Sequence, residues 1–335
     1  MNRGRRSGWG LVAGSLVAMA GLLLAGCGDR SSSNPRAPER IAFAILSAQG
    51  QASAAPLWQP LLDDLSQTIG VPVEPRFTAD YTELLGELER GQVQAAWLSP
   101  GPAVQAVDAG SAEVVARTVN ADGEASYRST LIVRRGAGIT LQDVLACGAR
   151  YSFGSGDAQS TSGTLAPQVF LFNPRNIRPE GCFKSVRTAN HERNAFEVAT
   201  GVLDVATSNT ATSAALERQN PVLAAQIETL WSSPPIPESG ILVRPDIDPV
   251  VKEKIRSFFL AYGRGDSSRA ARQREVLAAL NYSRFIAADD DYLDPVRELA
   301  ADQALTSARA SGDQAAAARA EAALKALRAK REIQP

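Results

Sequence analysis

The apolar positions in the first third of the chain predict strands and helices in alternation. Residues 41–45 form a nearly continuous apolar run, which suits a strand that is covered on both faces. Leucines and an isoleucine recur at every fourth position over 57–69, as on one side of an amphipathic helix, and a glycine follows. Extended, helical and strand-like patterns then succeed one another over 71–77, 81–90 and 93–98. Such alternation predicts a parallel sheet with helices packed on it.

A second series begins after an interruption at 127–133, where polar and apolar residues alternate before the segment becomes purely apolar. We expect in this series a strand near Phe153, a helix from about Thr164, a strand near Val186, a helix over 192–200 and a strand over 203–206. A proline-rich break then precedes a strand-like segment at 241–243, which we expect to return to the first unit. The sequence thus predicts two α/β lobes, the second inserted into the first and joined to it by two extended crossings. The expected boundaries are 39–135 with 240–300 for lobe 1, and 136–239 for lobe 2.

The C-terminal stretch 296–333 consists mainly of Ala, Arg, Glu and Leu, which are strong helix formers. Gly312 is a point at which this helix could be divided. We treat 301–335 as a helical tail and favour a solvated amphipathic helix over one that binds a partner or a second copy of the chain.

The N-terminus has the layout of a secretory signal. Three arginines precede an uncharged apolar stretch over 9–26, which ends in Leu24-Ala25-Gly26-Cys27. This ending resembles the bacterial lipobox, in which the cysteine receives a diacylglycerol and the signal is cleaved before it. We therefore expect a signal peptide over 1–26, a lipid on Cys27, a polar tether over 27–38 and a lipid-anchored protein on the periplasmic or outer side of the membrane. An ordinary signal and a membrane-spanning helix, which needs about 20 apolar residues, are the alternatives.

The charge and the cysteine content limit the possible classes of protein further. The whole chain carries 35 basic and 36 acidic residues, a formal net charge of −1, and loss of the three signal arginines makes it −4. Binding to nucleic acid calls for a strongly basic face, so we expect none. In an oxidising compartment Cys147 and Cys182 usually pair, and their places before two strand-like segments make a disulfide plausible. Two buried free thiols are the alternative.

Three polar loops of the second series are expected to meet, because ligands of open parallel sheets bind beyond the carboxyl ends of the strands. These loops are 154–163, 188–191 and 207–210. The first ends in Ser160-Thr161-Ser162-Gly163 at a helix start, where three hydroxyls add to the unpaired N–H groups and the positive end of the helix dipole. The pattern predicts a seat for a compact tetrahedral anion, although helix capping alone also favours Ser and Thr there. His191, the only histidine, follows the second loop and could donate to the anion as an imidazolium or a neutral N–H tautomer.

Several motifs resemble the phosphonate-binding proteins of ABC transporters, within the wider phosphate, phosphite and phosphonate-binding group. In chain order they are GSGDAQSTSG at 154–163, NHERNA at 190–195, DVATSNT at 204–210, SPPIP at 233–237 and DPVR at 294–297. The resemblance covers nearly the whole chain after the tether. It implies an α/β protein with the type II periplasmic-binding-protein fold, a ligand between the lobes, no cofactor, and permease and ATPase subunits as partners.

The resemblance also implies a set of ligand-binding residues. In the family the phosphonate oxygens are bound by the hydroxyl loop, by two tyrosines and by a histidine. The matching residues are Ser160, Thr161, Ser162, Tyr81, Tyr127 and His191. Gly163, Asn209, Ser99 and Ser239 are weaker candidates for the same shell.

Two positions depart from the family pattern. Family members that bind aminoethylphosphonate hold its ammonium with two carboxylates, and Ala211 and Ser239 occupy the matching places here. Glu238 lies one place away and is not expected to substitute for them. An unpaired ammonium in a closed cleft costs several kcal/mol, so we expect a ligand with a smaller or uncharged organic group, or phosphite or phosphate itself.

Other classes of protein are less favoured. Ser162 and His191 could serve as nucleophile and base of a hydrolase, but the sequence has no Gly-x-Ser-x-Gly elbow. We therefore expect no catalytic residue and no enzyme. One histidine and no Cys-x-x-Cys do not make a usual zinc site, so no metal is expected. A binding module coupled to a membrane sensor instead of a transporter would have the same clamp.

Overall fold

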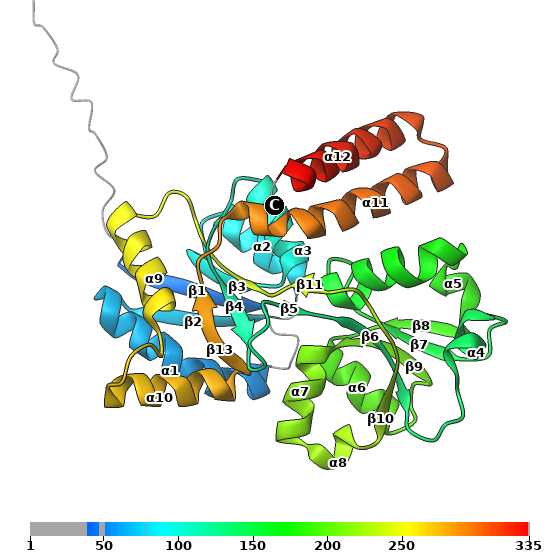
Figure 1. Ribbon diagram of the computed structural model, residues 1–335, viewed down its shortest axis with the longest axis horizontal. Helices are drawn as coiled ribbons and strands as arrows, with labels where there is room; N and C mark the ends of the chain where they lie inside the picture. Colours follow the sequence, from blue (N-terminus) through cyan, green and yellow to red (C-terminus); the bar gives the residue numbers. More distant parts are fainter. Residues whose placement is uncertain (1–38, 47–50, 79, 334–335) are drawn as a thin grey trace, which may run out of the picture. The chain divides into compact units, whose positions relative to one another are not determined.

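The computed structural model describes residues 39–46, 51–78 and 80–333 (Figure 1). The expected signal peptide, the tether and Cys27 lie outside these residues. None of the described helices is both long and apolar enough to span a bilayer.

The first sheet has six strands in the order β13-β4-β12-β3-β1-β2. Its strands are β1 (Ile41–Leu46), β2 (Val73–Thr78), β3 (Ala95–Leu98), β4 (Glu113–Asn120), β12 (Gly240–Val243) and β13 (Tyr282–Ile286). β1 is buried along its whole length and pairs in parallel with β2 and β3, as its continuous apolar run predicts. The late strand β12 is antiparallel to β3 and β4, so the chain returns to this sheet after the second lobe.

Helices cover both faces of the first sheet (Figure 1). They are α1 (Gln51–Ile69), α2 (Tyr81–Glu89), α3 (Pro100–Asp108), α9 (Pro249–Ala261) and α10 (Ser268–Ala279). Leu61 and Leu65 of α1 pack with Phe259 of α9 on one face, whereas Leu84 and Leu88 of α2 pack on the other. The two cores hold the strand ends of β1 and β3 at fixed positions beside the second lobe.

The second sheet has five strands in the order β10-β6-β9-β7-β8. Its strands are β6 (Ser129–Arg134), β7 (Ser152–Ser155), β8 (Ser185–Thr188), β9 (Val205–Asn209) and β10 (Ile227–Ser232). The accompanying helices are α4 (Leu141–Leu145), the π-helical turns η1 (Thr161–Leu165) and η2 (Gln168–Phe172), the 3-10 turn η3 (Asn173–Arg175), α5 (Pro179–Cys182), α6 (His191–Ala199), α7 (Thr210–Gln219) and α8 (Pro221–Ala224). The parallel strands β8, β7 and β9 bring the three polar loops to one edge.

One lobe boundary differs from the expected one. β6 is antiparallel to both β9 and β10, so residues 129–134 belong to the second sheet and the boundary expected at 135 is wrong. The first crossing is instead β5 (Ser126–Tyr127), which pairs with β11 (Ile236–Pro237) of the second crossing in a separate two-stranded ribbon. The two crossings are therefore hydrogen-bonded to each other.

The C-terminal region forms a helical hairpin. After the turn η4 (Asp290–Leu293), α11 (Asp294–Ser311) ends at Gly312, whose φ of 75° lies in the left-handed region that favours glycine, and α12 (Gln314–Ile333) follows. Leu305 of α11 packs against Leu324 of α12. The Asn173 side-chain amide of the second lobe donates to Gln303 of α11 at 2.8 Å. The expectation of a solvated tail is therefore wrong for α11, because its apolar side has partners in both α12 and the body of the protein.

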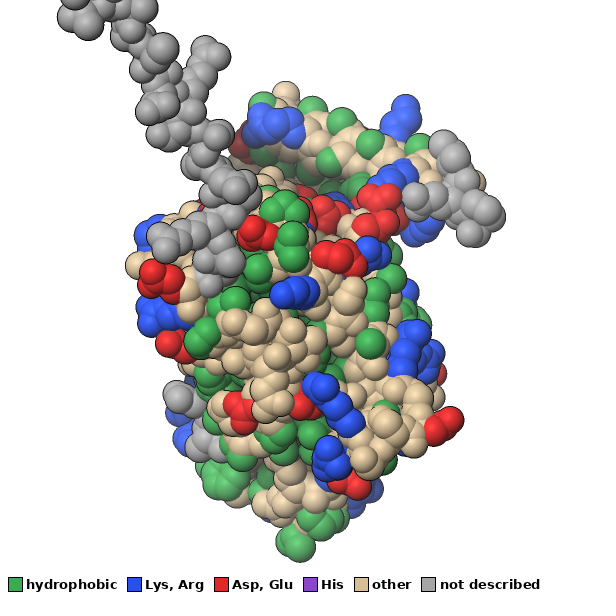
Figure 2. Space-filling view, turned by 90° about the vertical axis from the view of Figure 1, so that its left-hand side faces the viewer, with side chains coloured by type: hydrophobic (Ala, Val, Ile, Leu, Met, Phe, Trp, Pro, Cys, Tyr) green, Lys and Arg blue, Asp and Glu red, His purple; other side chains and the backbone are tan. Residues whose placement is uncertain are grey.

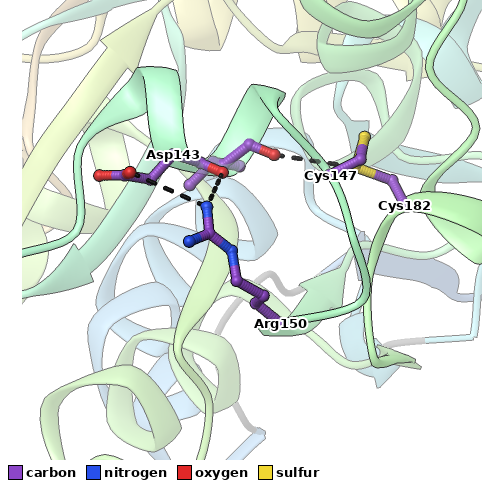
Figure 3. The surroundings of a disulfide bond; sticks show 5 residues. Asp143, Cys147, Arg150 and Cys182 are labelled. Carbon is purple, nitrogen blue, oxygen red and sulfur yellow. Dashed lines mark hydrogen bonds and ion pairs between the residues drawn. A yellow bond between two sulfur atoms is a disulfide. The ribbon is translucent and has the colours of Figure 1, made fainter.

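The structure joins Cys147 and Cys182 by a disulfide, with the two Cα atoms 4.5 Å apart (Figure 3). The bridge ties the turn after α4 to α5. Nearby, the Arg150 guanidinium lies 3.9 Å from the carboxylate of Asp143 in α4 (Figure 3). The crosslink thus secures the edge of the second lobe that lies away from the polar loops.

Candidate ligand-binding site

A cavity of about 120 Å³ lies between the two lobes. Eight of the ten predicted binding residues line it: Tyr81, Ser99, Tyr127, Ser160, Ser162, His191, Asn209 and Ser239. Thr161 and Gly163 do not. Both belong to the buried start of η1, and Thr161 is fully buried. The cavity thus combines groups of the first lobe, the crossings and the second lobe.

The three hydroxyls of the loop at 160–162, called the hydroxyl loop, have different partners: one caps η1, one contacts the first lobe and one faces the cavity. The Ser160 hydroxyl caps η1 by accepting the Gly163 N–H at 3.0 Å. The Thr161 hydroxyl accepts the Gly101 N–H of α3 at 2.7 Å, which links the second lobe to the first. Ser162 Oγ lies 3.1 Å from His191 Nε2 and accepts the Asn209 side-chain amide at 3.1 Å. Ser162 is therefore the hydroxyl that the surrounding polar groups orient at the cavity.

His191 is a neutral imidazole at physiological pH. Its side chain is only 4% exposed, and burial lowers its pKa from 6.5 to about 4. If Nε2 carries the proton, His191 and Asn209 both donate to Ser162 Oγ, and the Ser162 O–H is free to donate to a ligand. The imidazolium form considered from the sequence is disfavoured by this burial.

Two tyrosine phenols lie beside the hydroxyl loop. Tyr81 begins α2 and Tyr127 belongs to the crossing strand β5. Burial raises the pKa of the Tyr81 phenol, although the neighbouring Ser160 hydroxyl opposes the shift. Burial, followed by the charge of Glu238, raises the pKa of Tyr127 well above its usual range. Both phenols therefore keep their protons and can donate to an anion.

The first lobe supplies further unsatisfied donors at the end of β3. Trp97 Nε1 and Ser99 Oγ are buried without a well-formed hydrogen bond among the described residues, and both side chains line the cavity. They lie beside the phenols of Tyr282 and Tyr81, whose pKa values they lower against the effect of burial. Buried polar atoms normally have partners, so both groups can also bond to a ligand or to water. The sequence indicated Ser99, but nothing in it separated a packing role of Trp97 from a ligand-facing one.

Glu238 lines the cavity, although the sequence predicted no role for it in the site. Its side chain is 4% exposed and lines the cavity together with that of Ser239. The carboxylate accepts from the Thr118 hydroxyl and from the Ser239 N–H, each at 3.3 Å. Burial raises its pKa from 4.5 to about 7, and these two hydrogen bonds oppose the shift. A partly protonated carboxyl group thus faces the cavity from the second crossing.

Much of the remaining wall of the cavity is apolar, although it also includes Thr212, Arg218, Gln219, Asn281 and Tyr282. Leu57 and Trp58 of α1 lie on one side, and Ala211 and Ala215 of α7 on the other. Within the described residues, no cluster of three or more His, Cys, Asp or Glu side chains could hold a metal ion. The fold and the site together define a two-lobed binding protein, in which neutral hydroxyl, amide and phenol donors converge next to an apolar wall.

Comparisons with known proteins identify the family. The sequence profile of the family described as "ABC transporter, phosphonate, periplasmic substrate-binding protein" matches residues 43–293. The Phosphonates-binding periplasmic protein of Escherichia coli is 37% identical over 259 residues, which cover 77% of this chain and 75% of the relative. The chain therefore belongs to the family of phosphonate periplasmic substrate-binding proteins of ABC transporters.

Solved structures agree with this assignment. The crystal structure of a binding protein component of an ABC phosphonate transporter from Pseudomonas aeruginosa is 34% identical, with a TM-score of 0.83 and coverage of 89% of this chain and 99% of that one. A Prochlorococcus marinus protein solved in complex with methylphosphonate shares the fold at 18% identity, with a TM-score of 0.68 and coverage of 78% and 97%. The type II periplasmic-binding-protein fold with two α/β lobes, expected from the sequence, is confirmed.

Proposed function

We propose that this protein captures a phosphonate or a related phosphorus oxyanion between its lobes and delivers it to an ABC importer. The observation that carries the proposal is the Ser162 hydroxyl, which His191 and Asn209 hold at a cavity that two neutral tyrosine phenols also line. A doubly charged phosphoryl group accepts hydrogen bonds from such donors, and charge-assisted bonds are roughly twice as strong as neutral ones. The family membership supports the same ligand class.

Within this proposal, residues of both lobes contact the ligand. Ser160, Ser162, His191, Asn209 and the amides at the start of η1 form the seat in the second lobe, while Gly163 keeps the loop compact. An added Cβ at Gly163 would stand 2.7 Å from the Cα of Gly156. Tyr81 and Ser99 approach from the first lobe on closure. Thr161 supports closure through Gly101 rather than through the ligand.

The proposed ligand carries no ammonium group. Ala211 and Ser239 both line the cavity, and neither can pair with a cation. Glu238 also lines it, but its raised pKa leaves a large share of the carboxyl groups protonated at neutral pH. An alkylphosphonate, phosphite or phosphate fits this environment. A P. marinus protein of the same fold was solved in complex with methylphosphonate, a ligand without an ammonium group.

We further propose that the chain is exported, lipidated on Cys27 and anchored at the membrane by the tether. The support is the Leu-Ala-Gly-Cys sequence after an apolar signal-like stretch. Such an anchor keeps the clamp near the permease and ATPase subunits with which the family operates. A sensor-coupled role would use the same clamp, and neighbouring transporter genes would distinguish it.

A hydrolytic role is not favoured, although Ser162 and His191 are in contact. The depressed pKa of His191 makes it a weak base at neutral pH.

Calorimetric titration of the purified protein with methylphosphonate, phosphite, phosphate and aminoethylphosphonate tests the proposal. We expect at least one of the first three to bind, with aminoethylphosphonate no tighter than methylphosphonate. Ser162→Ala should weaken binding about 10- to 100-fold, since a hydrogen bond to a charged group contributes about 1.5–3 kcal/mol. Ser307→Ala, in α11 and outside the cavity, is the matched control. No binding of any phosphorus oxyanion would overturn the proposal, and tighter aminoethylphosphonate binding that Glu238→Gln abolishes would overturn its selectivity.

A further inference from the structure

One face of α7 runs outward along the cavity from the anion seat. Asn209 caps the helix and donates to Ser162 in the seat. Ala211, Ala215 and Arg218 then line the cavity at a spacing of four and three residues, which places them on one side of the helix. At 1.5 Å per residue, Arg218 stands about 13 Å farther along the helix axis than Asn209. The cavity therefore has a polar seat, an apolar middle and a cationic outer end.

Arg218 is the only lysine or arginine among the described residues that line the cavity. Its guanidinium donates to the side-chain oxygen of Asn281 at 2.6 Å, across the lobes. The charge of the neighbouring Glu217 also acts on it favourably. A guanidinium has five N–H donors in a planar fork that matches a carboxylate. The hydrogen bond to the neutral Asn281 side chain uses one N–H of the guanidinium, so further donors remain for an anionic group at the cavity mouth.

The wall between the seat and Arg218 is mainly apolar, although Thr212, Gln219 and Tyr282 also line the cavity. Ala211 and Ala215 face this stretch from α7, and Leu57 and Trp58 face it from α1. In Figure 1, α7 lies beside the end of α10, the helix that precedes Asn281. A chain of methylene groups leaving the seat along α7 would thus contact apolar side chains before it reaches the guanidinium.

We propose that the cavity selects phosphonates whose organic substituent ends in a carboxylate, with Arg218 as the residue that binds this second anionic group. The inference rests on the proposed function, because it presumes that the phosphonate occupies the seat beside Ser162. It names a substrate class within that function: phosphonates with an alkyl chain and an anionic end.

Titration with matched ligand pairs tests this inference. Carboxyalkylphosphonates from phosphonoacetate to 5-phosphonopentanoate are each compared with the unsubstituted alkylphosphonate of the same chain length. We expect at least one carboxylate to bind about tenfold tighter than its match at low ionic strength, and the advantage to shrink in high salt because the Arg218 site is exposed. Arg218→Gln should remove this advantage and leave the affinity for the alkylphosphonate unchanged. Arg328→Gln, on the exposed surface of α12, makes the same charge change and should retain it.

The outcomes separate the inference from the proposed function. If methylphosphonate and all its homologues fail to bind, the proposed function is wrong. If they bind but every carboxylate lies within about twofold of its match, the inference alone is wrong. If Arg218→Gln weakens alkyl and carboxyalkyl ligands by the same factor, Arg218 only fastens the lobes through Asn281, and the inference is again wrong.

Discussion

Two buried titratable groups in the cavity are shifted in opposite directions, which predicts a specific pH dependence of stability. His191 and Glu238 are each about 4% exposed. Burial lowers the pKa of His191 to about 4 and raises that of Glu238 to about 7. Each of these two shifts corresponds to about 3 kcal/mol in the free energy of unfolding.

The two contributions have opposite signs. Between pH 4 and 6.5 the unfolded chain binds a proton at His191 that the folded chain does not, so this term increases stability as pH rises. Between pH 4.5 and 7 the folded chain holds a proton on Glu238 that the unfolded chain releases, so this term decreases stability as pH rises. From pH 4.5 to 6.5 the two terms therefore largely cancel.

Replacing one of the two residues should reveal the pH dependence of stability that the other contributes. Relative to the wild type, Glu238→Gln should gain about 2 kcal/mol of stability on going from pH 4.5 to 6.5, and His191→Asn should lose a similar amount. Urea unfolding of the ligand-free protein at several pH values across this window measures both. The double variant should return to the wild-type slope. Parallel profiles for all four proteins would refute the reasoning, because they would mean that neither group is held in its shifted state.

Three further predictions concern other parts of the chain. Gly101→Ala should weaken ligand binding by about 1–3 kcal/mol, because the new Cβ would stand 2.9 Å from Thr161 Oγ1 and 3.0 Å from the Gln159 backbone oxygen, across the lobe contact. Calorimetry measures this, and wild-type affinity would contradict it. Replacing Cys147 and Cys182 by serine should lower the free energy of unfolding by about 4 kcal/mol for a loop of 35 residues. Denaturant unfolding measures it, and equal stability with and without the bridge would contradict it. Cys27→Ser should release the chain from membranes in a cell fractionation, whereas retention would argue against lipidation.

Local patterns in the sequence predicted most elements but not their pairing. The continuous apolar run at 41–45 and the four-residue repeat in α1 depend only on neighbours along the chain, and both elements formed where expected. The segment at 131–133 is also purely apolar, but from the sequence alone we interpret it as part of the interruption between the two lobes. Its membership of the second sheet depends on β9 and β10, which are distant in sequence, and no local pattern contains that information.

For the site, too, the sequence predicted what depends on local patterns and missed what depends on tertiary contacts. The convergence of three polar loops follows from the rule for parallel strands, and it placed Ser162, His191 and Asn209 together. The sequence could not show that Thr161 bonds to Gly101 instead, because that contact joins two lobes whose relative position is a tertiary property. The inward direction of Glu238 likewise depends on how the second crossing meets β4.

The pairing of β5 with β11 couples recognition to hinge movement. Tyr127 lies in β5, opposite Ile236 of β11. Glu238 directly follows β11 in the second crossing. In the closure proposed above, a ligand that contacts Tyr127 or Glu238 would touch the segments about which the lobes rotate. We therefore expect substitutions at these two positions to change ligand preference and the balance between open and closed forms together, so that the two properties would not evolve independently.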